Sequence, residues 1–175
     1  MKTRLFRRIA SALLFIPLLL CGCTQQRNMD TAEFCRRFNA LQKSETLLSE
    51  TFFREAAEDT REYNTSLPFG NGETALLTLH TDAAGTVTAF QITAVASDMQ
   101  NTPEAFGALY ETYIQLVTVL TVSGKAEDGE TLVRTAGILP DNLGFVDFGF
   151  VGEAGTHCFS VFSGEMYISM FCERV

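Results

Sequence analysis

Residues 73–96 read ETALLTLHTDAAGTVTAFQITAVA, and the pattern of this stretch indicates the fold class. Apolar and polar residues alternate in its first part, and β-branched and aromatic residues are frequent in residues 86–96. The segment DAAG at residues 82–85 is typical of a turn. Together these features predict two antiparallel strands joined as a hairpin.

The register of this hairpin follows from the length of its turn. A four-residue turn would pair Thr81 with Thr86. That pairing would set Leu77 opposite Phe90 on an apolar face, because directly opposed side chains lie on the same side of a sheet. His80 would then lie on the other face.

Two helices are predicted on either side of the hairpin, and each begins with residues that favour a helix start. Residues 30–33 read DTAE and residues 101–104 read NTPE, so a capping side chain is followed three positions later by a glutamate. Apolar residues then recur at helical spacing. The first helix should run to about residue 43, and the second should end near Gly124.

The remaining segments of the chain add both helical and strand-like patterns. Residues 44–61 are compatible with a strand or an irregular crossing, and residues 129–137 form a short amphipathic stretch. Three further strands are expected at residues 145–151, 157–162 and 166–172, with connections short enough for antiparallel pairing. The sequence therefore predicts an α+β fold, with helices packed on one face of an antiparallel sheet.

The two helix starts, at Asp30 and Asn101, lie in different halves of the chain, and each is followed by strand-like segments. An internal duplication would produce this helix-then-strands pattern twice. Shared capping chemistry would also produce it, because any capped helix favours these residue types. The sequence alone leaves both explanations open.

The N-terminal segment, residues 1–23, differs from the rest of the chain. Residues 1–8 contain four basic residues and no acidic one, and residues 9–20 form a mostly apolar run. This order is that of a signal peptide. The apolar run is shorter than the roughly 20 residues that a helix needs to cross a bilayer. A permanent membrane-spanning helix is therefore the weaker interpretation.

The run ends in Leu20, Cys21, Gly22 and Cys23, and with these residues the segment resembles the lipobox of bacterial lipoprotein signals. Leu20 lies three positions before Cys23 and the small Gly22 lies directly before it, as in that family. Alignment on Cys21 instead would put the bulky Leu20 at the cleavage site. An ordinary secreted protein with incidental cysteines is the other interpretation.

The resemblance implies that residues 1–22 are a removable signal peptide and that Cys23 is lipidated. The lipid would be a diacylglycerol thioether, and the new N-terminus would be acylated, with palmitate as an expected acyl group. Several acyl chains hold a protein firmly on a bilayer. Residues 23–29 would be the lipidated cysteine and a short tether, and residues 30–175 a single domain on the extracytoplasmic face of the cell membrane.

Net charge restricts the partners. Thirteen basic residues less the four in the signal leave nine, against 21 acidic residues, so the mature chain has a net charge of −12. Such a surplus argues against nucleic acid, because affinity for phosphate backbones comes largely from clustered basic side chains. It also argues against electrostatic attraction to a membrane surface. The membrane is therefore expected as a partner only through the lipid anchor.

Three cysteines follow the lipobox, namely Cys35, Cys158 and Cys172, so at most one bridge can form within the chain. If residue 163 pairs with residue 167, Cys158 lies opposite Cys172, and this register suits a cross-strand disulfide. A slip of one residue would put the two side chains on opposite faces and forbid the bridge. A disulfide and two free thiols both remain open.

Catalytic and metal-binding patterns are weak. His157 adjoins Cys158, but neighbours on a strand point to opposite faces, so these two side chains cannot easily act together. His80, the other histidine, comes from a distant hairpin, and a dyad of Cys158 with His80 is not favoured. Spacings typical of zinc, calcium or phosphate-binding motifs do not occur. We therefore expect no metal and no cofactor.

Phenylalanine is concentrated near the C-terminus, at Phe145, Phe148, Phe150, Phe159, Phe162 and Phe171. These side chains would either pack a sheet core or line a groove for a peptide or acyl ligand. The first functional expectation is a non-enzymatic binding module for an envelope protein or a small apolar ligand. A secreted inhibitor-like module is a further option.

The alternative from a different class is a membrane-tethered hydrolase. Its acid–base groups would be scattered carboxylates that no sequence pattern distinguishes. The candidates are Glu62, Asp98, Asp147 and Glu153.

Overall fold

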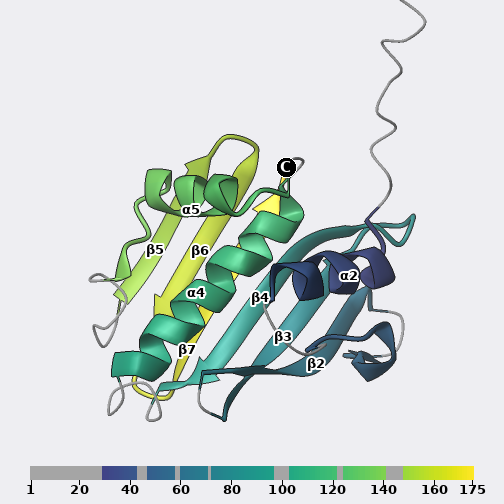
Figure 1. Ribbon diagram of the computed structural model, residues 1–175, viewed down its shortest axis with the longest axis horizontal. Helices are drawn as coiled ribbons and strands as arrows, with labels where there is room; N and C mark the ends of the chain where they lie inside the picture. Colours follow the sequence, from purple (N-terminus) through teal and green to yellow (C-terminus); the bar gives the residue numbers. More distant parts are fainter. Residues whose placement is uncertain are drawn as a thin grey trace, which may run out of the picture.

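The computed structural model describes residues 29–42, 47–57, 60–70, 72–96, 103–121, 124–140 and 148–175. The predicted signal peptide and Cys23 lie outside these residues, as do Asp98 and Asp147. The described part of the chain contains a seven-stranded antiparallel sheet and three α-helices (Figure 1). The predicted α+β class is therefore confirmed.

The elements follow one another in a regular order. They are α2 (Thr31–Leu41), a 3₁₀ turn η1 (Glu50–Phe52), β1 (Arg54–Glu55), β2 (Glu62–Phe69), β3 (Glu73–Thr81), β4 (Val87–Val95), α4 (Pro103–Leu120), α5 (Ala126–Thr135), β5 (Phe148–Ala154), β6 (His157–Ser163) and β7 (Tyr167–Arg174). The strand order in the sheet is β1-β2-β3-β4-β7-β6-β5. The last strand of each half of the chain therefore pairs with the other at the centre of the sheet.

The predicted hairpin is present as β3 and β4, but its register is shifted by two residues. Leu77 pairs with Ile92 and not with Phe90, because the strands shift register between His80 and Thr81. The Asp82 side chain accepts backbone hydrogen bonds within the turn, which holds Thr86 in the loop. A shift of two residues keeps each side chain on its face, so the predicted apolar face is still formed.

Strand β2 was not predicted, because Pro68 and several polar residues make its sequence unlike that of a strand. Its Thr65, Leu67 and Phe69 are nevertheless buried at alternate positions. The neighbouring β1 pairs only with Tyr63 and Asn64, so β2 is an edge strand beyond that point. A proline is tolerated at such an edge because its missing N–H has no partner to serve.

The C-terminal strands lie close to the predicted ranges, since β6 ends one residue later than expected and β7 begins one residue later and ends two residues later. Strand β5 covers residues 148–151 of the predicted range and continues three residues beyond it, through Gly152 to Ala154. Gly152 is required there because a Cβ would lie 2.9 Å from the carbonyl oxygen of Ala136, just after α5. Residues 145 and 147 lie outside the described part of the chain.

Helix α5 differs from the predicted amphipathic stretch, because it begins at Ala126 and contains Gly129 in its interior. A Cβ on Gly129 would lie 2.9 Å from both the carbonyl oxygen of Ile114 and the Cα of Thr118. The glycine is therefore explained by the close approach of α5 to α4, and not by a helix start.

The core lies between the sheet and α4. Tyr113 and Val117 of this helix are fully buried, as predicted for its apolar side. The Tyr113 ring contacts Phe90 edge-on, and its hydroxyl donates a 2.9 Å hydrogen bond to the carbonyl oxygen of Phe171. Helix α4 thus joins β4 and β7, and Figure 1 shows α2 and α5 drawn on the same side of the sheet.

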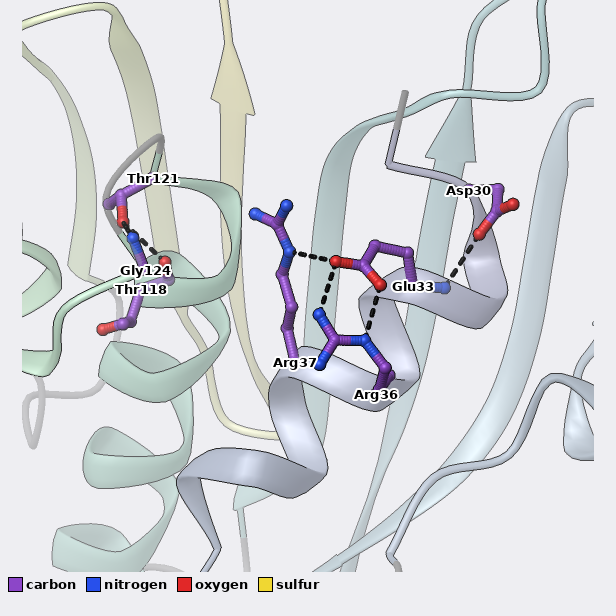
Figure 2. Close-up of polar contacts among 7 residues, drawn as sticks. All are labelled: Asp30, Glu33, Arg36, Arg37, Thr118, Thr121 and Gly124. Atoms are coloured by element: carbon purple, nitrogen blue, oxygen red, sulfur yellow. Dashed lines mark hydrogen bonds and ion pairs between the residues drawn. The ribbon is translucent and has the colours of Figure 1, made fainter. Parts of the chain in front are cut away.

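Helix α2 begins as its sequence predicts. The Asp30 side chain accepts a 2.8 Å hydrogen bond from the backbone N–H of Glu33. The Glu33 carboxylate in turn accepts hydrogen bonds from Arg36 and Arg37, and Figure 2 shows both arginines turned towards it. These contacts fix the first turn of the helix.

Candidate functional site: the open face of the sheet

Strand side chains that alternate with the buried ones form a second surface of the sheet, which we call the open face. Its central rows, read across the strands from β3 to β5, are Thr78, Gln91, Phe171, Ser160 and Val151, and then Leu76, Thr93, Ser169, Phe162 and Gly149. Apart from Arg54 at the β1 edge, the side chains of these two rows and of their β2 partners are uncharged.

An acidic row borders these uncharged rows near the β3–β4 turn. It contains Glu62, His80, Ala89, Glu173, Cys158 and Glu153. Nδ1 of His80 lies 3.5 Å from the Glu62 carboxylate, and its ring meets Phe171 edge-on. One end of the open face is therefore negatively charged.

A chain of neutral polar groups lies at the centre of the open face, where β4 pairs with β7. The Gln91 amide donates a 2.8 Å hydrogen bond to Ser169 and a longer one, 3.3 Å, to Thr93. The Thr93 and Ser169 hydroxyl oxygens are 3.2 Å apart. Both amide hydrogens of Gln91 thus point along the sheet, and its carbonyl oxygen accepts no hydrogen bond from the described residues.

An exposed aromatic pair adjoins this polar chain. Phe162 and Tyr167 are each 47% exposed, and their ring centroids lie 5.7 Å apart. Gly164, in the turn between them, leaves room for the Phe162 ring, because a Cβ there would lie 3.0 Å from it. The turn therefore helps to set the position of this ring.

Two hollows that described residues line open on this face, one on each side of the central polar chain. The larger has a volume of about 500 Å³, and its lining on the open face consists of Gln91, Gly149, Val151, Ser160, Phe162, Ser169 and Phe171. The smaller has a volume of about 300 Å³ and lies over β2, β3 and β4, with Leu76, Val95 and Tyr167 as its large apolar side chains. The larger hollow exists because glycine and serine alternate with bulkier residues across the strands.

The disulfide option for Cys158 and Cys172 is contradicted. Phe159 pairs with Cys172, and Cys158 pairs with Glu173, which is one residue away from the register that a bridge needs. Cys158 therefore lies on the open face and Cys172 in the core. All three cysteines of the described residues are free thiols.

The thiols have little nucleophilic character. Burial raises the pKa of Cys35 to about 11 and raises that of Cys172 further. Partial desolvation and the adjacent Glu153 and Glu173 carboxylates raise the pKa of Cys158. Because the thiolate is the reactive form, these environments oppose thiol catalysis.

The predicted catalytic candidates are not brought together. His80 and Cys158 share one row but are three strands apart, or about 14 Å at the usual strand spacing. Glu62 and Glu153 lie on β2 and β5, five strands apart, or about 24 Å. His157 is buried on the other face from Cys158, and burial lowers its pKa. Among the described residues, no three His, Cys, Asp or Glu side chains are grouped as metal ligands.

The sequence identified only part of this surface. Phe162 and Phe171 belong to the predicted aromatic set and line the larger hollow, whereas Phe159 of that set is buried in the core. Gln91 and Ser169 were missed, because they come from strands whose pairing no local pattern indicates.

Comparison with known proteins gives no family, since no family model matches the chain and no curated protein or solved structure is significantly similar to it. Within the described ranges, no helix combines the length and apolar character needed to span a membrane.

Proposed function

We propose that this protein is a lipid-anchored bacterial envelope lipoprotein whose domain is a binding module, with the open face as its binding surface. The observation that carries this proposal is that both hollows open on the same sheet face, on either side of the Gln91 hydrogen-bond chain. Concave sites lined by apolar side chains and a few fixed polar groups are the usual form of ligand sites.

The lipobox at residues 20–23 supports the anchor, which would hold the domain on the extracytoplasmic face of the membrane. The tether that follows, residues 24–29, has six residues and reaches at most about 21 Å when fully extended. A surface on the domain would therefore meet partners within a short distance of the bilayer.

We also propose that α2, α4 and α5 all pack on the face opposite the open face. The placement of the helices in Figure 1 supports this arrangement, as do the buried side chains of α4. This arrangement would leave the open face free for a ligand, because the helices would cover only the other face of the sheet.

A duplicated origin would explain why there are two hollows. Each half of the chain includes a helix and, after it, three consecutive antiparallel strands, β2–β4 in the first half and β5–β7 in the second, and β4 and β7 pair at the centre. The first half has the short β1 in addition, and the second has α5. The smaller hollow is lined by β2, β3 and β4 with Tyr167 from β7. The larger is lined by β5, β6 and β7 with Gln91 from β4. We propose that the two hollows are equivalent sites that have diverged.

The alternative of a membrane-tethered hydrolase receives less support. Paired carboxylates act on one substrate only when they lie within several ångströms of each other, about 5 to 10 Å in glycoside hydrolysis. The rows of the sheet separate Glu62 from Glu153 by more than this.

Site-specific photo-crosslinking in cells tests the binding surface. A photoreactive phenylalanine analogue at Val95 or Val151, which are 52% and 81% exposed on the open face, should form adducts. The same analogue at Glu111, an exposed position on α4, is the control and should not. Adducts from Glu111 alone, or none from either valine position, would contradict the assignment of the open face.

Metabolic labelling with a clickable fatty acid tests the anchor. The unaltered protein should incorporate the label, and Cys23→Ser should abolish incorporation and leave a precursor or a form lost from the membrane fraction. Cys21→Ser is the matched control and should remain labelled. Equal labelling of the Cys23→Ser protein would exclude lipidation at that residue.

A further inference from the structure

We infer that the larger hollow binds a neutral saccharide unit. This inference rests on the proposed function, because it names the ligand class of the same open face. It follows from the polarity of the lining, from the exposed aromatic ring beside it and from the position of the nearest charges.

The lining combines two kinds of surface. Gln91, Ser160 and Ser169 supply an amide and two hydroxyls, and Val151, Phe162 and Phe171 supply apolar walls. A pyranose ring has the matching surface, since its C–H groups form apolar faces and its hydroxyls form a polar rim. The free carbonyl oxygen of Gln91 can accept from a sugar hydroxyl, while its amide hydrogens remain bound to Ser169 and Thr93.

A wholly apolar ligand fits this lining less well. An acyl chain seated against Gln91 and the serines would remove water from these polar groups and offer no hydrogen bond in return. The smaller hollow, which is lined mainly by Leu76, Val95 and Tyr167, has more apolar character. The polar ligand is therefore assigned to the larger hollow.

Charge favours a neutral ligand. The residues that line the larger hollow include no Lys, Arg, Asp or Glu. The nearest carboxylates are those of Glu153 on β5 and Glu173 on β7, in the adjacent acidic row. Each lies two residues along its strand from a lining residue, which is about 7 Å. An anionic group would meet these carboxylates without a cation to balance it.

The aromatic pair gives the sugar a surface on which to stack. The half-exposed Phe162 ring borders the hollow, and its contact with Tyr167 and the space left by Gly164 restrict its position. A restrained ring loses little conformational freedom on binding. Stacking of a sugar face on Phe162 would place the sugar hydroxyls towards Ser169 and Gln91, because Phe162 pairs directly with Ser169 across the strands.

Saturation-transfer NMR on the lipidated protein in detergent tests this inference. The probe is chitotetraose, a neutral N-acetylated tetrasaccharide, with the anionic tetragalacturonate as the comparison probe. We expect saturation transfer from the protein to ring protons of chitotetraose, with a dissociation constant of about 1 mM or tighter. The anionic tetragalacturonate should bind at least about tenfold more weakly.

Gly149→Leu is the decisive variant. Gly149 lines the hollow, and a Cβ there has no neighbour within 4 Å, so the leucine side chain can fill the hollow without strain. We expect Gly149→Leu and Phe162→Ala to weaken chitotetraose binding by about tenfold or more. Leu76→Ala, on the same face but beside the smaller hollow, is the matched control and should bind as the unaltered protein does.

Absence of transfer to chitotetraose, equal binding of tetragalacturonate or undiminished binding by Gly149→Leu would each overturn the assignment of a neutral saccharide. Photo-crosslinks from Val151 to a protein, together with any of these results, would leave the open face as the binding surface and replace the saccharide with a protein partner. Loss of the crosslinks as well would overturn both proposals.

Discussion

Gly129 sets the distance between α4 and α5. Its lack of a side chain lets the backbone of α5 approach Ile114 and Thr118 so closely that a Cβ would meet backbone atoms at 2.9 Å. Backbone atoms cannot move aside as the end of a flexible side chain can. A residue that disfavours helices is therefore required in the middle of this one.

Gly129→Ala should destabilise the domain, although alanine favours helices by up to about 1 kcal/mol over glycine. The clash with α4 should outweigh that gain and cost about 1 to 3 kcal/mol, as overpacked sites do. Gly107→Ala, in α4, is the matched control, because no atom lies within 4 Å of the added Cβ. Denaturant unfolding of residues 24–175 measures the stability of both variants. A lower midpoint for Gly107→Ala than for Gly129→Ala would refute the assigned contact.

Glu33 should make stability depend on pH in acid. Hydrogen bonds from Arg36 and Arg37 lower the pKa of this carboxyl from about 4.5 to about 2 in the folded state. The ionised form therefore stabilises the fold at pH values above about 4.5, and this contribution is lost as the pH falls towards 2. The contribution should be at most about 1 kcal/mol, because Arg36 is 68% exposed.

Comparison of the unaltered domain with Glu33→Gln measures this contribution. The difference in unfolding free energy should be largest near neutral pH and should vanish at about pH 2. Glu111→Gln, an exposed site on α4, should change stability little at either pH. A Glu33→Gln difference that grew on acidification would show that the arginines do not stabilise the carboxylate.

At the scale of the elements, α4 is the helix that ties the two halves of the sheet together. Its Tyr113 bonds to the backbone of β7 and packs against Phe90 of β4. The apolar spacing along residues 103–120 was enough to predict which side would be buried. Gln115 of the same helix accepts a 2.5 Å hydrogen bond from Gln42, which follows the last residue of α2.

Val117→Asp should destabilise the domain by several kcal/mol, or prevent folding, because it buries a carboxylate without a partner. Glu111→Asp, an exposed position on the same helix, places the same side chain in solvent and is the matched control. Thermal melts of residues 24–175 compare the two. Similar melting temperatures would mean that the buried side of α4 is misassigned.

The register of β6 and β7 decides the state of the cysteines. Ser163 pairs with Ile168 and not with Tyr167, so one residue more than predicted lies between the last paired residues, and the Gly164 N–H donates a hydrogen bond to the carbonyl oxygen of Tyr167. That single residue moves Cys158 and Cys172 to opposite faces. The alternation of polar and apolar residues does not show whether a loop has three residues or four, so the sequence could not distinguish the two registers.

Thiol labelling should show this register directly. In residues 24–175 kept folded, iodoacetamide should modify Cys158 slowly and leave the buried Cys35 and Cys172 intact. All three should react after unfolding without a reductant. A Cys158–Cys172 bridge recovered from the purified protein by peptide mapping would refute the register. In the Cys158→Ser variant, treatment with a mild oxidant should not change the melting temperature.

For the whole molecule, the pairing of the two halves was the least predictable feature. The hairpin of β3 and β4 and the helix starts could be recognised locally. The pairing of Ala89–Val95 with Tyr167–Glu173 could not, because it joins segments from opposite halves of the sequence that carry no complementary pattern. Since this pairing brings Gln91 beside Ser169, the polar centre of the candidate site was beyond the reach of the sequence as well.

The net charge should affect the stability of the whole domain. Residues 24–175 have a net charge of −12, so the folded domain should be stabilised by salt, because screening weakens repulsion within a compact state. The melting temperature should rise between ionic strengths of about 0.01 M and 0.15 M, over which the Debye length falls from about 30 Å to about 8 Å.

A variant with Glu62, Glu153 and Glu173 all changed to glutamine is the control for this effect. These three glutamates share the acidic row of the open face, so their removal should flatten the dependence of the melting temperature on salt. A steeper dependence in the triple variant would show that the row is not a source of repulsion.

The central pairing of β4 with β7 also sets the order of events during synthesis. The chain emerges with its N-terminus first, so β4 exists long before β7, the last strand of the sheet, can reach it. During this interval the first half presents an unpaired strand edge, which is the geometry through which nascent chains associate with one another. A chain truncated before β7 should therefore aggregate. Protection of this strand edge until β7 has been synthesised would prevent such association in the cell.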